Sequence, residues 1–252
     1  NKYIIKSIEK MVDYIYRYSD KIFTTSPSFV EAIISRDVDE SKVEYWPQYA
    51  ESFYKPLNDV RSKEIVNDGR INIIFTGNIG YAQGLELLPK ATILQEKGYG
   101  DKVRFNIVGD GRYKQELINI IKRTGLTDMF NLIDRKPPEE IPALLNSSDV
   151  AFLSFANNDL FNKTIPAKLQ SYLACGIPII ASAGGESKRI IEEAKSGYCT
   201  ETGNAEKLTE SILKFINLDH KEKLIMRKNA RTYYESHFDK EMLLNIMDKN
   251  FY

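Results

Sequence analysis

The chain has 252 residues, of which 42% are hydrophobic and 28% are charged, a composition typical of a soluble globular protein. Its 35 Lys and Arg residues balance 35 Asp and Glu residues, and this lack of a basic excess argues against a nucleic-acid-binding protein. No apolar run reaches the roughly 18 residues of a membrane span, and no signal peptide is recognisable, so we expect a cytoplasmic location. Because the chain begins with Asn1 rather than Met, we interpret it as a fragment.

The N-terminal quarter is predicted to be a short mixed segment followed by a linker. Apolar residues recur at helical spacing over residues 1–18, which predicts an amphipathic helix. A short strand is predicted at Lys21–Thr25. Ser26 is a typical N-cap and, with a proline behind it, predicts a helix that ends near Ser35. Residues 36–60 are rich in turn-forming residues and are predicted to be a linker.

From Ile71 onward, apolar runs alternate with amphipathic stretches. Strands are predicted at Ile71–Thr76, Val103–Val108, Phe130–Ile133, Val150–Phe155, Ile177–Ala181 and Tyr198–Thr200. Helices are predicted at Leu85–Lys97, Tyr113–Thr124, Pro138–Asn146, Pro166–Ala174, Glu186–Ala194, Ala205–Ile216, about 221–235 and 239–251. Strict alternation predicts an α/β fold with a doubly wound, Rossmann-like parallel sheet. Such sheets bind ligands at the carboxyl ends of their strands.

Glycines cluster directly after three of the predicted strands. They are Gly77 and Gly80, then Gly109 and Gly111, and finally Gly184 and Gly185. A glycine allows close approach of a phosphate, and each following helix offers free N–H groups, although each pair is also compatible with a tight turn. Arg112, beside the second loop, is compatible with a phosphate contact or with a solvated surface position.

Lys168 lies in the first turn of a predicted helix, where a cation opposes the helix dipole at a cost of about a few tenths of a kcal/mol. A bound diphosphate would compensate that cost, whereas an exposed lysine is the plainer alternative.

The sequence contains only two cysteines, Cys175 and Cys199, and two histidines, His220 and His237. Their spacing fits neither a metal site nor a Cys–His pair, so we expect no metal and two buried, reduced thiols. No catalytic residue is identified. Several phosphate-compatible loops on one sheet edge predict a bound nucleotide diphosphate.

These segments, taken in order, resemble the C-terminal half of glycosyltransferases with the GT-B fold, family 4 (glycosyl transferases group 1). The resemblance covers residues 58–252. It is carried by the loop at Val108–Gly111, the helix and strand at Ile141–Ser154, the segment Gln170–Ile179, the turn Gly184–Glu186, and His237-Phe238 with the last helix. The segments Phe75–Gly80 and Ala82–Glu86 resemble a narrower, fucosamine-transferase-like branch of bacterial surface polysaccharide synthesis.

The resemblance implies a domain division and a reaction. Residues 1–56 would be a remnant of the N-terminal acceptor domain with the linker, residues 57–236 the nucleotide-sugar-binding domain, and residues 237–252 a helix that crosses back. The implied enzyme is a retaining hexosyltransferase that uses a UDP-sugar, here a UDP-linked N-acetylated or deoxy amino sugar, without a metal or other cofactor.

The chain departs from the family pattern at four donor-binding positions. Asn78 and Gln83 replace the usual Arg and Lys of the first loop, and Lys163 and Ser171 replace two glutamates. The resemblance then predicts donor binding through a larger set, in which Lys163, Lys168 and Arg112 supply the missing cations, Arg135 or Lys136 lies near the uracil, and Ser171 or Gln170 contacts the ribose. Leu169 and Glu186, with the glycine loops, complete the expected donor site.

In the full enzyme, the resemblance implies a saccharide or polyprenyl-diphosphate-linked acceptor, with peripheral contact at the inner face of the plasma membrane. Because most of the acceptor domain is missing, we expect this fragment alone to bind a donor without turnover.

Two alternative functions remain open. One is a nucleotide-sugar 2-epimerase, which needs acid–base groups that the two histidines do not offer in a strand-end loop. The other is a non-catalytic nucleotide-sugar-binding or scaffold domain. A flavodoxin-like or receiver domain is excluded by length and by the lack of an acidic cluster after the first strand.

Overall fold

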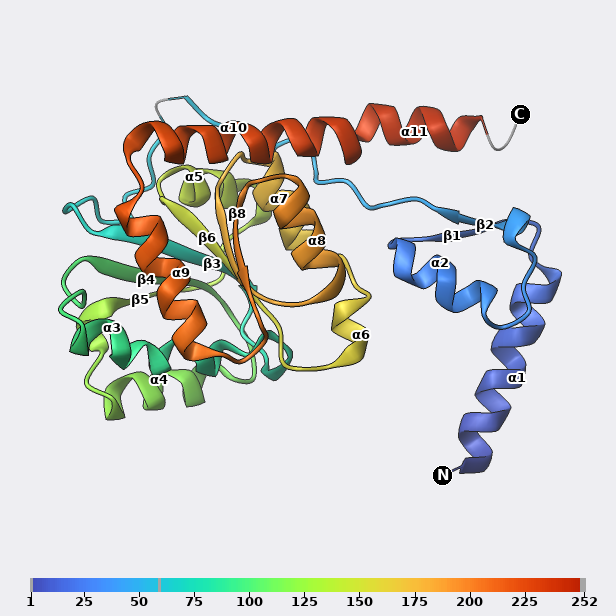
Figure 1. The fold of residues 1–252 in the computed structure, drawn as a ribbon, viewed down its shortest axis with the longest axis horizontal. Coiled ribbons are helices and arrows are strands. Elements are labelled where there is room, and N and C mark those ends of the chain that lie inside the picture. The colour runs from blue at the N-terminus through green and yellow to red at the C-terminus, as the bar shows by residue number, and fades with distance from the viewer. Residues whose placement is uncertain (1, 59, 250–252) are drawn as a thin grey trace.

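The computed structural model describes residues 2–58 and 60–249 and divides into a small N-terminal unit and a larger α/β unit (Figure 1). The N-terminal unit contains helix α1 (Lys2–Tyr18), strand β1 (Ile22–Thr24), helix α2 (Pro27–Ile34) and strand β2 (Val43–Tyr45). The strands β1 and β2 form a parallel pair. Ser26 caps α2 through a hydrogen bond that its hydroxyl accepts from the N–H of Phe29, as the sequence predicts.

The α/β unit is built on a parallel sheet of six strands in the order β5-β4-β3-β6-β7-β8. Their bounds are β3 Ile71–Asn78, β4 Val103–Asp110, β5 Phe130–Ile133, β6 Val150–Ser154, β7 Ile179–Ser182 and β8 Gly197–Thr200. The chain order reverses at β3, which lies between β4 and β6. The predicted α/β fold with a doubly wound parallel sheet is therefore confirmed, and β3 marks its topological switch point.

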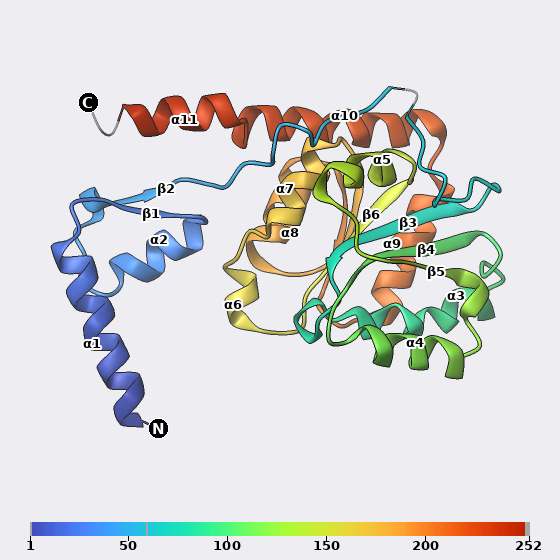
Figure 2. The same cartoon turned by 180° about the vertical axis from the view of Figure 1, so that it is seen from behind.

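Helices cover both faces of the sheet, with two separate hydrophobic clusters beneath them (Figures 1 and 2). Helices α3 (Thr92–Glu96), α4 (Lys114–Arg123) and α9 (Ala205–Asn217) cover one face. Helices α5 (Ile141–Asn146), α7 (Ala167–Ala174), α8 (Gly185–Glu193) and α10 (His220–His237) cover the other. A sheet buried on both faces explains why its strands read as continuous apolar runs.

Three local predictions are corrected by the structure. The helix predicted at Leu85–Lys97 is instead a chain of 3-10 turns at Leu85–Leu87 and Pro89–Ala91 that reaches α-helical geometry only in α3. Pro89 explains the break, because proline removes a backbone donor and clashes with the preceding turn. The predicted linker 36–60 contains β2, and the strand predicted at Ile177–Ala181 begins only after Pro178, at Ile179.

The C-terminal helices run back toward the N-terminal unit (Figure 1). Helix α10 is followed by α11 (Lys240–Asp248), and the predicted end at residue 251 lies outside the described residues. The indole N–H of Trp46 donates to the carbonyl oxygen of Leu243 at 3.0 Å, and the Tyr234 hydroxyl donates to that of Ala50 at 3.2 Å. The two helices are thus tied to the segment that leads into the α/β unit.

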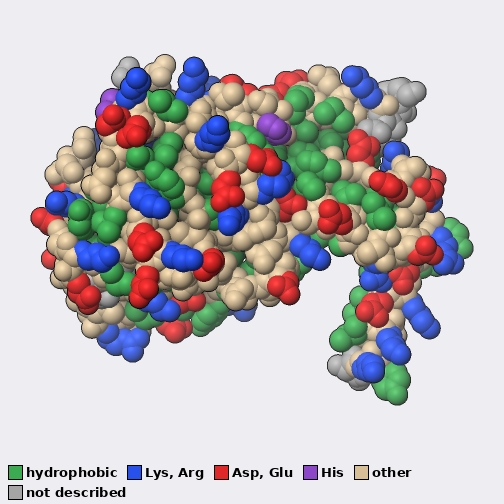
Figure 3. All heavy atoms as spheres, viewed as in Figure 1, with side chains coloured by type: hydrophobic (Ala, Val, Ile, Leu, Met, Phe, Trp, Pro, Cys, Tyr) green, Lys and Arg blue, Asp and Glu red, His purple; other side chains and the backbone are tan. Residues whose placement is uncertain are grey.

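Helix α1 projects from the molecule and exposes apolar side chains (Figure 3). Ile4, Ile8, Met11 and Ile15 are each at least half exposed. Within residues 2–58 and 60–249, no helix is both long and apolar enough to cross a bilayer. Both cysteines are free thiols, but only Cys175 is buried, and Cys199 is half-buried because it lies on the edge strand β8.

Candidate functional site

A cavity of about 670 Å³ opens at the carboxyl edge of the sheet, beside the switch-point strand β3. It is lined by residues from the ends of β3 and β4, the loop after β5, the first turns of α5 and α7, and the N-terminal linker. They are Tyr54, Thr76, Gly77, Asn78, Val108, Gly109, Asp110, Gly111, Arg135, Lys136, Pro138, Ile141, Ala167, Lys168 and Ser171. The position agrees with the rule that places ligands of open α/β sheets at this edge.

Glycines form the part of the cavity where β3 and β4 end side by side. Gly77 and Gly109 are partners in the sheet register, and Gly111 follows directly after β4. Their φ angles are +132°, +145° and +155°, in the region that side chains rarely adopt. A Cβ at Gly109 would lie 1.9 Å from the carbonyl oxygen of Gly77, and one at Gly111 would lie 2.3 Å from that of Ile79. Only glycine fits at Gly109 and Gly111, because any side chain there would collide with the neighbouring backbone.

The N-terminus of α7 forms the opposite wall of the cavity. No side chain caps this helix, which begins after Pro166. Its orientation is fixed one turn later by Tyr172, which is fully buried and whose hydroxyl accepts hydrogen bonds from the backbone N–H and the hydroxyl of Thr76. Because residues four apart share a helix face, this anchor also directs Lys168 toward the end of β3. The positive end of the helix dipole therefore faces the cavity.

The ammonium of Lys168 lies inside this cavity without a counterion. Its Nζ is 4.1 Å from the centre of the Phe75 ring, and a Cβ built on Gly77 would lie 3.3 Å from it. Among the described residues it has no hydrogen-bond acceptor and no ion-pair partner. Burial lowers the pKa of this amine to about 7, because a charged group loses solvation there. A half-buried cation without a counterion, beside a helix N-terminus, is an arrangement that a bound anion would stabilise.

Two further cations stand on the loop that follows β5. Arg135 is exposed and has no ion-pair partner among the described residues. Lys136 forms an ion pair with Glu64, and the hydrogen bond from its ammonium to that carboxylate raises the pKa of Lys136. The only carboxylate that lines this cavity within the described residues is Asp110, whose Oδ1 accepts the N–H of Gly111 at 2.8 Å. The charge balance of the lining is therefore positive.

Tyr54 and Ser171 complete the lining, and Tyr54 is a residue that the sequence did not single out. Tyr54 belongs to the segment predicted as a linker and is half-buried against the cavity. Burial raises the pKa of Tyr54, so its hydroxyl stays protonated at neutral pH. The hydroxyl of Ser171 donates to the carbonyl of Ala167, one turn earlier in α7. Gln170, the other predicted ribose contact, points away and donates to the carbonyl of Gln48.

The predicted residues around the third glycine loop lie outside this cavity. Glu186 is 4% exposed, and its carboxylate accepts hydrogen bonds from the N–H and hydroxyl of Ser28 and from Arg189. Burial alone would raise the pKa of Glu186, but these hydrogen bonds outweigh it and lower that pKa. Gly184 and Gly185 pack against Asn162, where a Cβ on Gly185 would lie 1.8 Å from its carbonyl oxygen. This loop therefore joins the N-terminal unit to the α/β unit.

The remaining predicted residues also lie elsewhere. Lys163 is exposed, and its carbonyl oxygen accepts the hydroxyl of Ser26. Arg112 points along α4 into a separate surface groove. Leu169 is fully buried in the core beneath α7, and Gly80 packs against Asn78 and Gln83 beside the cavity. The structure thus brings together Gly77, Asn78, Gly109, Gly111, Arg135, Lys136, Lys168 and Ser171 from the predicted set.

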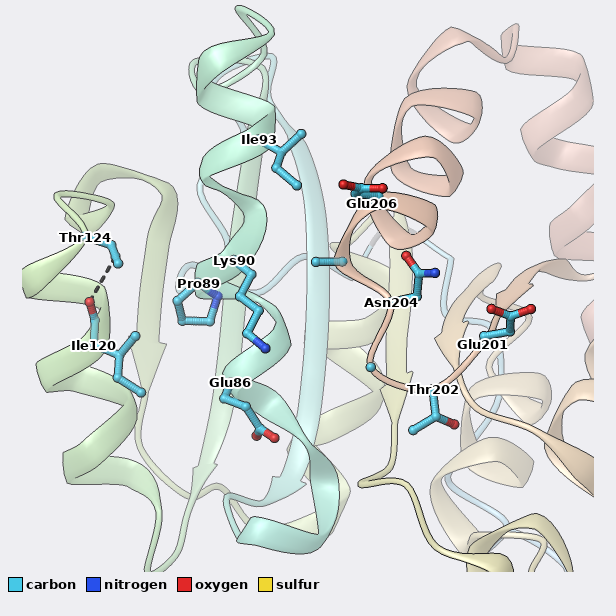
Figure 4. Close-up of a pocket in the computed structure, with 12 residues that line it drawn as sticks. Glu86, Pro89, Lys90, Ile93, Ile120, Thr124, Glu201, Thr202, Asn204 and Glu206 are labelled. Atoms are coloured by element: carbon cyan, nitrogen blue, oxygen red, sulfur yellow. Dashed lines mark hydrogen bonds between the residues drawn. The ribbon is translucent and has the colours of Figure 1, made fainter.

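A larger cavity of about 860 Å³ lies between the segment around α3 and the start of α9 (Figure 4). Glu86 and Lys90 stand on one wall, and Glu201, Asn204 and Glu206 stand on the facing wall. Three carboxylates against one lysine disfavour a phosphate here. We therefore regard the smaller, cationic cavity as the better candidate for an anionic ligand. Within the described part of the chain, no group of three or more His, Cys, Asp and Glu side chains is placed to hold a metal ion.

Comparison with known proteins identifies a family. Residues 58–233 match the model of glycosyl transferases group 1. The putative colanic acid biosynthesis glycosyltransferases WcaL and WcaI of Escherichia coli K12 are 28% and 27% identical to the chain. These matches cover 69% and 89% of the chain, but 43% and 55% of the relatives. The chain therefore spans about half the length of the curated relatives it matches.

Solved structures share the fold. The crystal structure of Anabaena HepE in complex with UDP and glucose superposes with a TM-score of 0.77 at 18% identity. The superposition covers 94% of this chain and 64% of HepE. At that level of identity the likeness concerns the fold alone.

Proposed function

The chain belongs to the glycosyl transferases group 1, and from that membership we propose that it is the donor-binding part of a glycosyltransferase. In this proposal residues 57–236 form the nucleotide-sugar-binding domain. Residues 1–56 are the remnant of an N-terminal acceptor domain with its linker, and residues 237–252 are the helix that crosses back to it. The hydrogen bond from Trp46 to Leu243 of α11 supports that last assignment.

The unpaired ammonium of Lys168 is the observation that carries the proposal. It lies in the carboxyl-edge cavity together with the uncapped N-terminus of α7 and the glycines at the ends of β3 and β4. A nucleotide diphosphate supplies the negative charge that this arrangement lacks, and the glycines that line the cavity expose backbone rather than side chains to its phosphates. Lys168 then replaces the cations that family members carry where this chain has Asn78 and Gln83.

We favour a UDP-sugar as the donor. HepE, which shares the fold, was crystallised with UDP and glucose. Membership of a fucosamine-transferase-like branch, as the segments Phe75–Gly80 and Ala82–Glu86 imply, narrows the sugar to an N-acetylated or deoxy amino sugar. Arg135, which has no ion-pair partner among the described residues, is available at the cavity mouth for the nucleoside. Ser171 lies within the same lining and is our candidate for the ribose contact.

The chemistry that these groups support is stabilisation of a leaving nucleotide diphosphate. As the bond between sugar and phosphate breaks, negative charge grows on the diphosphate oxygens. The ammonium of Lys168 and the N-terminus of α7 are preorganised to stabilise that charge without a metal ion. In this proposal the anomeric configuration is retained, as in the resembling enzymes, and no residue of this chain is assigned as a catalytic acid or base.

The proposed setting is cell-surface polysaccharide synthesis at the cytoplasmic face of the membrane. The names of WcaL and WcaI support a role in exopolysaccharide assembly. The acceptor in the full enzyme would be a saccharide or a polyprenyl-diphosphate-linked saccharide, with peripheral membrane contact through the N-terminal domain. Because the relatives are about twice as long, we propose that the chain alone binds a donor without turnover.

Calorimetric titration of the chain with UDP and with GDP tests the donor assignment. We expect saturable UDP binding, and we expect Lys168→Met to weaken it about 10- to 100-fold, the loss of one charge-assisted contact. Lys163→Met is the matched control, because Lys163 is exposed and outside the cavity, and it should bind UDP like the wild type. If neither UDP nor GDP binds the wild type, or if both lysine variants bind equally well, the assignment of this cavity is wrong.

A non-catalytic nucleotide-sugar-binding domain is the second candidate. It is favoured by Asn78 and Ser171, which stand in the cavity where the family usually has an Arg and a Glu. The two candidates separate when a full-length protein with this domain is assayed. Release of UDP from a UDP-sugar in the presence of a saccharide acceptor supports the transferase, and donor binding without release supports the non-catalytic domain.

A further inference from the structure

The cavity at the carboxyl edge holds one half-buried amine that has no hydrogen-bond acceptor among the described residues. The Phe75 ring, 4.1 Å from the Lys168 Nζ, favours the charged amine through a cation–π contact, whereas burial and the positive end of the α7 dipole disfavour it. Within residues 2–58 and 60–249, no carbonyl, hydroxyl or carboxylate accepts a hydrogen bond from this Nζ. Lys168 therefore has no ion-pair partner to stabilise its charge. Loss of the proton is the other way in which an amine avoids the cost of burial.

The charged groups that line the cavity are mainly cationic, and Asp110 is the one opposing charge among the described residues. The loop after β5 contributes Arg135 and Lys136, and the charge of Lys136 is taken up by Glu64. The end of β4 contributes Asp110, which is exposed and already accepts the Gly111 N–H. The linker contributes Tyr54, which stays neutral because burial raises its pKa.

We propose that binding of a nucleotide diphosphate in this cavity is coupled to the uptake of one proton, and that Lys168 receives it. This inference rests on the proposed function. In the empty cavity a neutral amine avoids the cost of a half-buried charge that lacks a counterion. When diphosphate oxygens arrive beside Nζ, the charged form gains hydrogen bonds and Coulomb energy, so a proton moves from buffer or water onto the amine. No covalent bond of the ligand changes in this step.

The coupling has a functional consequence. Because burial lowers the pKa of Lys168 to about 7, the amine of the free protein loses its proton as the pH rises above neutrality. Above that pH the affinity for the diphosphate should fall, by as much as about tenfold for each pH unit, because each bound ligand then requires one proton from solution. A cavity with a permanently charged arginine would bind without that dependence, since a guanidinium stays protonated.

Proton-counting calorimetry distinguishes a lysine that takes up a proton on binding from a cation that is charged throughout. The chain is titrated with UDP at pH 8 in buffers of different ionisation enthalpy, and the slope of the observed heat against that enthalpy gives the number of protons taken up. Lys168→Arg is the matched control, because it keeps a cation at this position but cannot titrate. UDP contributes the same protons in both proteins, so the difference between them reports residue 168 alone. We expect the wild type to take up nearly one proton more than Lys168→Arg.

A direct titration covers the case in which Lys168→Arg folds poorly. Carbon-13 NMR of the lysine Cε atoms, with Lys168→Met used for assignment, should show one resonance that titrates near pH 7 in the free chain and at a higher pH with UDP. UDP binding with equal proton counts in the two proteins, or a Lys168 resonance that titrates near the ordinary lysine value without ligand, overturns the inference but leaves the donor site standing. Absence of UDP binding by the wild type overturns both.

Discussion

At the amino edge of the six-stranded sheet, as at its carboxyl edge, cationic side chains line a polar cavity. The amino-edge cavity has a volume of about 590 Å³ and includes Arg61, Lys223 and Arg227. There Arg227 donates to the carbonyl oxygen of Ser148 at 2.5 Å, and Lys223 donates to that of Ile216 at 3.4 Å. At the carboxyl edge, Lys168 donates to no described residue.

A structural cation and a ligand-binding cation on one sheet differ in what they contact in the free protein. A side chain such as Arg227 satisfies backbone acceptors of the fold, so its removal costs stability. A side chain such as Lys168 satisfies nothing in the free protein, so its removal costs little stability and the ligand supplies its partner. The backbone also differs between the two edges. Glycines with positive φ gather at the carboxyl edge, where β3 and β4 approach each other closely.

The largest effect is expected from adding a side chain to a glycine at the carboxyl ends of β3 and β4. In Gly109→Ala the new Cβ meets the carbonyl oxygen of Gly77 at 1.9 Å, which forces the ends of β3 and β4 apart. We expect a loss of about 3 kcal/mol or more in the free energy of unfolding, together with loss of UDP binding. Urea denaturation and calorimetry measure the two effects.

The matched control for that substitution is Gly125→Ala. Gly125 also has a positive φ, of +68°, but a Cβ there meets nothing within 4 Å. Backbone strain alone should then lower the free energy of unfolding, by about 1–2 kcal/mol, and UDP affinity should not change. Equal destabilisation by the two substitutions would show that close packing of the strand ends does not matter.

The second prediction concerns the structural cation. Arg227→Met leaves the carbonyl of Ser148 without its donor and should lower the free energy of unfolding by about 1–3 kcal/mol. UDP affinity should remain that of the wild type. A variant that keeps wild-type stability but loses UDP affinity would reverse the roles assigned to the two edges.

The third prediction uses the pH dependence of stability. The pKa of Lys168 is about 7 in the folded chain and about 10.4 in an unfolded one. Between these values the unfolded chain binds more protons, so the free energy of unfolding rises with pH, by about 2 kcal/mol between pH 7 and 9. Urea denaturation at several pH values should show this rise in the wild type and not in Lys168→Met. A rise of equal size in both proteins would exclude Lys168 as its source.

The smallest effect is expected at the exposed cation of the cavity mouth. Arg135→Ala should weaken UDP binding only about two- to fivefold, and less at high salt, because exposed charges are screened. Arg123→Ala, on α4 and outside the cavity, serves as the control and should have no effect. A loss above tenfold that persists at high salt would instead indicate a direct, desolvated contact from Arg135.

The sequence predicted the sheet well because its strands are buried on both faces and therefore read as continuous apolar runs. The run Ile71–Thr76 identified β3, and the glycines after β3 and β4 line the cavity at the carboxyl edge, where the sequence predicts the ligand. The helix prediction around Pro89 was wrong because the amphipathic spacing of this segment indicates a helix, whereas its proline interrupts one.

Side-chain direction is the part that the sequence could not supply. Arg112 and Lys163 stand in the expected loops, but they point along α4 and into solvent rather than into the cavity. Glu186 was predicted to contact a donor, whereas it holds Ser28 at the N-terminus of α2 through contacts between distant parts of the chain. Tyr54 was missed for the same reason, since only tertiary packing brings the linker to the cavity.

A crystal structure of the chain with UDP would show directly whether the carboxyl-edge cavity is a nucleotide diphosphate site. We predict that the diphosphate lies at the N-terminus of α7, with Lys168 Nζ within hydrogen-bond distance of a phosphate oxygen and the phosphates against Gly109 and Gly111. UDP bound between α3 and α9 instead, or at the carboxyl edge with its diphosphate away from Lys168, would contradict the account.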